Sequence, residues 1–172
     1  MGIYKYDLPP RPQLHFLKCY VNDLFESHGN NSKRIVEITR FKENETIYLD
    51  RNYTNKFKSS LFDKCFLIKL PRHNQNNIDL FLEESCIIYR FVSLRNDNKF
   101  YSDWQKLYIP INISAISCNH NYVVSKEFPK GFVSLPSGGP YASDPILIQA
   151  KENINWQKLF RLENVSVQKG YY

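Results

Sequence analysis

A chain of 172 residues with 42% hydrophobic content and a net charge of +6 is long enough to bury one self-sufficient core, so we expect a single domain over residues 1–172. No apolar run approaches the roughly 20 residues needed to cross a bilayer, which predicts a protein without a membrane span. The start of the chain lacks the apolar core of a signal peptide, which predicts an intracellular protein, cytoplasmic or nuclear, or a secreted one if a signal peptide has been removed.

The residue usage favours strands over helices. Aromatic residues make up 15% of the chain, and alanine occurs only at Ala115, Ala142 and Ala150. Asn, Lys, Ile, Phe and Tyr are abundant, which is typical of an AT-rich source such as a virus, a protist or a yeast.

The first predicted element is a helix over residues 12–27. Leu14, Leu17, Val21 and Leu24 fall at helical spacing, and a glycine follows the segment. Further along, the predicted elements are a hairpin of residues 34–41 and 46–49, a short amphipathic helix within 53–64, and β-rich segments at 65–70, 78–94 with a break at Glu83-Glu84, and 106–116.

The last third of the chain changes character. Proline and glycine concentrate in residues 129–145, which predicts an ordered loop. Asp144 could cap a helical segment that runs to Phe160, although residues 146–148 could equally form a strand. Residues 165–172 look like a peripheral tail.

Together these elements predict a β-rich α+β fold. It would be a small OB-like barrel or a sandwich, with an N-terminal helix and a C-terminal helical segment. Residues 16–26 and 38–41 resemble the first helix and first strand of small telomerase-accessory OB-fold subunits, over less than a fifth of the chain. This resemblance implies a barrel.

The sequence contains no motif typical of an enzyme. Neither the P-loop nor the dinucleotide-binding pattern occurs, and Ser137-Gly138-Gly139 lacks the pattern of a nucleophile elbow. Cys118 and His120 are the one close pair of metal-binding residue types, and two ligands do not make a site. We therefore expect a non-catalytic protein without a cofactor or a metal.

Basic residues interleaved with aromatic ones suggest the function. Residues 51–72 hold six basic residues against one acid, and residues 100–104 place three aromatic side chains in a predicted loop. Ammonium and guanidinium groups neutralise phosphates, while aromatic rings stack on unpaired bases. The hypothesis is a binding or assembly module that contacts nucleic acid or a ribonucleoprotein. Its candidate contacts are Arg51, Lys56, Lys58, Lys64, Lys69, Arg72, Phe100, Tyr101 and Trp104.

Five Asn-x-Ser/Thr sequons support an alternative. They would suit a secreted or viral β-sandwich that binds a host protein. In that setting the four cysteines Cys19, Cys65, Cys86 and Cys118 would form two disulfides, whereas in an intracellular protein they would be thiols.

Overall fold

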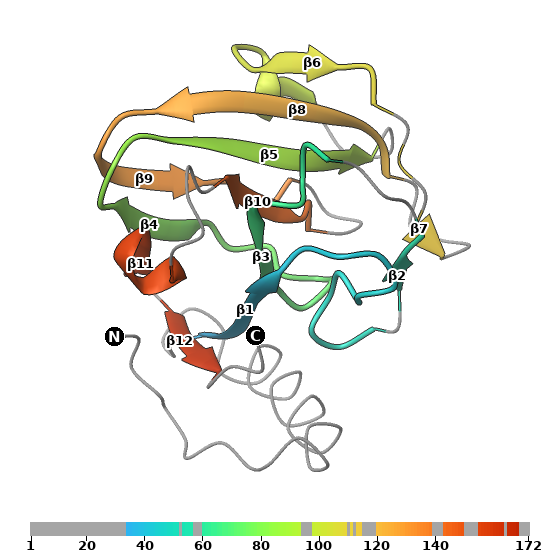
Figure 1. Cartoon of the computed structure of the whole chain (residues 1–172), viewed down its shortest axis with the longest axis horizontal. Helices are drawn as coiled ribbons and strands as arrows, with labels where there is room; N and C mark the ends of the chain where they lie inside the picture. The colour runs from blue at the N-terminus through green and yellow to red at the C-terminus, as the bar shows by residue number, and fades with distance from the viewer. Residues whose placement is uncertain are drawn as a thin grey trace.

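The computed structural model shows β-structure throughout most of the part of the chain that it describes (Figure 1). The helical elements of that part are two 3-10 turns, η3 (Asn98–Tyr101) and η4 (Trp156–Lys158). None of its helices is long and apolar enough to cross a membrane. The described residues are 34–51, 53–56, 60–93, 98–109, 111, 113–114, 120–138, 143–149, 155–163 and 165–168. The helix predicted over residues 12–27 therefore lies outside them.

Seven strands form the larger sheet, in the order β12-β1-β3-β10-β5-β8-β6. Neighbours are antiparallel except β1 and β12, which are parallel. The strands are β1 (Arg34–Arg40), β3 (Cys65–Lys69), β5 (Cys86–Ser93), β6 (Gln105–Leu107), β8 (His120–Phe128), β10 (Ile146–Gln149) and β12 (Val165–Gln168). The sheet is open, with β12 and β6 at its two edges, so the predicted OB-like barrel is wrong.

A second, antiparallel sheet packs on the larger one and consists of β11 (Phe160–Leu162), β4 (Ile78–Leu82) and β9 (Gly131–Leu135), in that order. Buried and partly exposed positions alternate along β4, so Ile78, Leu80 and Leu82 point into one core. The same core contains Ile38 of β1 and Ile148 of β10. The prediction of a β-rich fold is confirmed, and the two packed sheets match the sandwich alternative.

The opposite face of the larger sheet holds a second core. Strand β3 is buried at every position because it has a core on each side: Phe66 faces the first core and Leu67 the second. The segment between β1 and β3 covers the second core with Phe41, Tyr48 and Phe62. Strand β2 (Thr54–Asn55) of this segment pairs with β7 (Ile113–Ser114).

The described residues do not confirm the predicted C-terminal helical segment, and residues 146–148 form the strand that was its alternative. Ile146, Leu147 and Ile148 are all fully buried because β10 lies between β3 and β5 in the sheet. Ile146 and Ile148 contact the first core and Leu147 the second, an alternation that a strand produces and a helix does not. The described part after residue 154 contains one 3-10 turn, η4, before β11.

Several other predicted elements differ from the structure in their type or in the strand with which they pair. The hairpin of residues 34–41 and 46–49 does not form, since β1 pairs with β3 and β12, and Tyr48 makes an isolated bridge with Leu70. No helix occurs in the described part of residues 53–64. Strand β9 occupies the first part of the predicted 129–145 loop, and the predicted tail contains β12, whose Val165 is buried.

Candidate functional site

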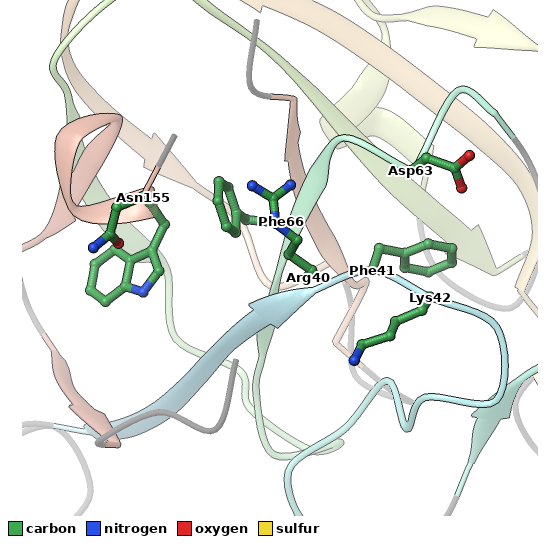
Figure 2. Close-up of a pocket in the computed structure, with 7 residues that line it drawn as sticks. Arg40, Phe41, Lys42, Asp63, Phe66 and Asn155 are labelled. Atoms are coloured by element: carbon green, nitrogen blue, oxygen red, sulfur yellow. The ribbon is translucent and has the colours of Figure 1, made fainter. Parts of the chain in front are cut away.

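An open cleft of about 580 Å³ lies where the end of β1 meets β3 and η4 (Figure 2). These elements are far apart in the sequence and are brought together by the pairing of β1 with β3 and by the packing of η4 on the first core. The lining residues are Arg40, Phe41, Lys42, Asp63, Phe66, Asn155 and Trp156.

Arg40 lies over the ring of Phe66, with 4.6 Å between the guanidinium carbon and the ring centroid. The register causes this contact, because Arg40 and Phe66 are directly opposite each other in the antiparallel pair of β1 and β3. Figure 2 shows the guanidinium beside the ring within the cleft. Attraction between a cation and a ring face restricts this long side chain. A guanidinium is a planar group that can bind a carboxylate or a phosphate through two hydrogen bonds.

Exposed ammonium groups border the cleft. Lys42 is exposed, and the Asn55 side-chain amide donates to its carbonyl oxygen at 3.1 Å, which holds the turn after β1. The ammonium of Lys56, also exposed, donates to Oδ1 of Asn44 in the same turn at 3.3 Å. Lys64 is exposed directly before β3. Lys56 and Lys64, two of the predicted contacts, are not lining residues: Lys56 contacts the turn that follows Lys42, and Lys64 follows the lining residue Asp63 in the sequence.

The far wall of the cleft is the 3-10 turn η4. Asn155 caps this turn by accepting a hydrogen bond from the backbone N–H of Gln157 at 3.3 Å, and it is exposed. Trp156 is 2% exposed and packs near Phe160. The aromatic residues thus form a buried floor, and the polar groups stand at the rim.

The lining of the cleft has an excess of positive charge. Asp63 is the one carboxylate among the seven, so the described lining lacks the second carboxylate of an acid–base pair. Arg40 and Lys42 line the same cleft, so the lining has two cationic groups and one carboxylate.

Lys69 was expected on the basic surface, and the structure buries it. Its side chain is 3% exposed, and its ammonium lies 3.3 Å from Glu37 Oε1 and 2.7 Å from Glu45 Oε1. Thr46 Oγ1 accepts a further hydrogen bond from it at 3.0 Å. Lys69 faces Glu37 across the β1–β3 pair, so it neutralises buried carboxylates and is not available to a partner.

Arg51 and Arg72 both lie around Asp50, away from the cleft lining. Arg51 forms an ion pair with Asp50 at 3.2 Å, and the backbone N–H of Arg72 donates to Asp50 Oδ1 at 2.9 Å. The Arg72 guanidinium carbon lies 5.5 Å from the Tyr53 ring centroid. Both arginines are half-buried, and Lys58 lies outside the described residues.

The predicted aromatic loop divides into exposed and buried residues. Phe100 is 47% exposed. Tyr101, however, is 5% exposed, and its hydroxyl donates to Asp144 Oδ2 at 2.7 Å. Trp104 is partly buried and makes edge contacts with the rings of Tyr101 and Phe128. The expectation that all three aromatic residues are exposed is therefore wrong, since two of them pack into the fold.

Sequence reasoning missed the centre of the cleft. It placed Arg40 in a strand and Trp156 in a helix, and it assigned neither to a site. The position of Arg40 depends on its partner across the sheet, Phe66, and no local pattern encodes that register. Alternation along residues 34–41 is the one signal that could have indicated on which face Arg40 lies.

The fold defines a two-sheet β-protein with a cleft at the end of β1. No protein-family model matches the chain, and a search of curated proteins gives no match. Among solved structures, the chain is similar to "a beta-glucuronidase from glycoside hydrolase family 2", with a TM-score of 0.54 and 10% sequence identity. The match covers 72% of this chain and 14% of that chain. At this identity the likeness concerns the fold alone.

Proposed function

We propose that the chain is a non-catalytic binding module that holds the phosphate backbone of single-stranded nucleic acid at the cleft around Arg40. The observation that carries this proposal is the guanidinium held over Phe66, with the ammonium of Lys42 in the same cleft. A fixed guanidinium with a nearby ammonium suits a phosphate diester, because the first gives bidentate hydrogen bonds and the second a flexible point charge.

The buried floor limits the kind of recognition. Phe66 and Trp156 are 3% and 2% exposed, so neither ring face is open to a stacked base. Binding would rest on phosphate contacts, which are independent of sequence. These contacts weaken as the salt concentration rises, because the release of counterions from the nucleic acid then gains less free energy. Lys56 and Lys64 would extend the contacts along the strand.

The rival proposal is a secreted or viral β-sandwich that binds a host protein. Asn44, the sequon residue in the turn after β1, is exposed, as a glycosylation acceptor must be. Cys65 and Cys86 are buried thiols, and the two-disulfide arrangement expected for this rival would need both of them oxidised. Quantifying thiols in the unfolded, unreduced protein separates the two proposals.

The direct test is fluorescence anisotropy of labelled single-stranded RNA and DNA at about 50 and 150 mM salt. Lys42→Glu and Arg40→Glu are expected to lower the affinity at least about tenfold at the lower salt. Lys130→Glu makes the same change of charge at an exposed turn outside the cleft lining and serves as the matched control. Absence of binding at low salt, or equal losses in all three variants, would overturn the proposal.

A further inference from the structure

The outer face of the three-stranded sheet carries a row of three side chains. Arg161 of β11, Phe81 of β4 and Phe132 of β9 are directly opposite one another. They point away from the core, since the alternate positions of each strand fill it. Phe132 is 64% exposed, and the Arg161 guanidinium carbon lies 4.2 Å from the Phe81 ring centroid. We refer to these three residues as the aromatic row.

Hydrogen-bonding groups border the aromatic row on one side. Asp79 and Ser134 are opposite each other in β4 and β9, and Ser134 Oγ donates to Asp79 Oδ1 at 2.6 Å. The side-chain amide of Asn77 donates to the same Oγ at 3.4 Å. A carboxylate, a hydroxyl and an amide are therefore connected in one exposed chain next to the rings.

At the other end, two carboxylates hold the arginine in place. Arg161 Nη1 lies 2.7 Å from Glu83 Oε1, and its Nε lies 3.0 Å from Glu163 Oε1. These residues comprise three carboxylates, Asp79, Glu83 and Glu163, and one guanidinium, Arg161, so they are net negative whereas the cleft lining is net positive. The negative charge of this face disfavours the binding of an anionic polymer.

We propose that this face binds a neutral oligosaccharide. A pyranose ring has an apolar C–H face that packs on an aromatic ring and a rim of hydroxyls that need donors and acceptors. The aromatic row offers the first surface, and Asp79, Ser134 and Asn77 offer the second.

The size of the apolar surface argues against a protein partner. A standard protein interface buries about 800 Å² on each side, whereas a phenylalanine side chain buries about 150–250 Å² at most. The Arg161 guanidinium lies over the Phe81 ring, so Phe132 is the more open of the two rings, and its area matches one sugar unit. None of these residues lines the cleft around Arg40, so the proposal stands apart from the proposed function.

The test uses the full chain and a panel of uncharged tetrasaccharides derived from cellulose, xylan, mannan, laminarin and chitin. Isothermal titration calorimetry measures binding, and ¹⁵N chemical shifts locate it. At least one tetrasaccharide is expected to bind and to shift the amide signals of β4 and β9. Phe132→Ala should weaken that binding at least about tenfold, because the ring supplies most of the apolar contact. Phe100→Ala truncates another exposed ring, on η3, and should leave the affinity unchanged.

Phe132 is exposed, so Phe132→Ala should keep the fold, and thermal unfolding checks this. The proposal is overturned if no tetrasaccharide binds at millimolar concentration, or if Phe132→Ala and Phe100→Ala bind equally. It is also overturned if sedimentation shows a dimer that Phe132→Ala disrupts, since the face would then belong to a second copy of the chain.

Discussion

Tyr101 donates a hydrogen bond from its hydroxyl to Oδ2 of Asp144 at 2.7 Å, and the two residues are 43 positions apart in the sequence. Asp144 is fully buried in the segment that leads into β10. Arg90 of β5, also fully buried, donates to the carbonyl oxygens of Ser137, Asp144 and Pro145. Side chains from η3 and β5 thus hold the loop between β9 and β10 against the larger sheet.

Removal of the Tyr101 hydroxyl should destabilise the fold. Tyr101→Phe keeps the ring and deletes the donor to a buried carboxylate, which is expected to lower the free energy of unfolding by about 1–3 kcal/mol. Urea unfolding followed by circular dichroism measures the change. Tyr108→Phe is the control, because Tyr108 is 90% exposed and the substitution should have no effect. Equal stability of the two variants would contradict the assigned role of the hydrogen bond.

Gly138 should tolerate no side chain. Its φ is +113°, and a Cβ atom there would overlap the Asp144 carboxylate. Gly131→Ala is a matched control, since Gly131 has a φ of +135° with no atom within 4 Å of the added Cβ. Both substitutions strain the backbone, and Gly138→Ala should lower the free energy of unfolding by about 1–3 kcal/mol more. Similar losses would show that Asp144 moves aside without cost.

Lys69 should be essential to the β1–β3 pair. Lys69→Met leaves the buried carboxylate of Glu37 without its cation and is expected to cost about 3–5 kcal/mol in the free energy of unfolding. Lys64→Met, at an exposed position directly before the same strand, should change the stability little. Adding Glu37→Gln to Lys69→Met should restore part of the loss, because it removes the uncompensated charge. Chemical unfolding of the single and double variants tests this, and the absence of any rescue would argue against the ion pair.

Stability should fall in alkaline solution. Burial, with a smaller effect of Asp63, raises the pKa of the Cys65 thiol from 9.0 to about 12. Burial also raises the pKa of Tyr101 from 10.0. Between about pH 9 and 12 the unfolded chain loses these protons while the folded chain keeps them, so unfolding releases protons and its free energy decreases as pH rises. Below about pH 9 neither group contributes a pH dependence.

Unfolding free energies measured from about pH 7 to 11 check this expectation. Cys65→Ala and Tyr101→Phe should each flatten the alkaline slope. An unchanged slope in both variants would mean that other groups cause the loss of stability.

The sequence predicted where some of the strands form, but it did not predict β8, β9 or β12. Alternating apolar residues and the shortage of alanine indicated strands near residues 34–41, 65–70 and 78–94, and the break at Glu83-Glu84 separates β4 from β5. These signals are local, because period-two alternation reflects one buried face of a single strand. The signal failed at residues 146–148, where burial on both faces produces a continuous apolar run that fits either a strand or a helix.

By itself, the sequence determined that the chain is β-rich, basic and long enough to form a core, since these properties follow from composition and from neighbours along the chain. The tertiary structure alone decided which strands pair. This pairing in turn decided which charged side chains are exposed. Lys69 looks like any other lysine of a basic segment until β3 pairs with β1 and places it opposite Glu37. The same register places Arg40 over Phe66 in the cleft. The sequence of one strand alone could not predict this contact, because a contact across a sheet depends on how two separate segments are aligned.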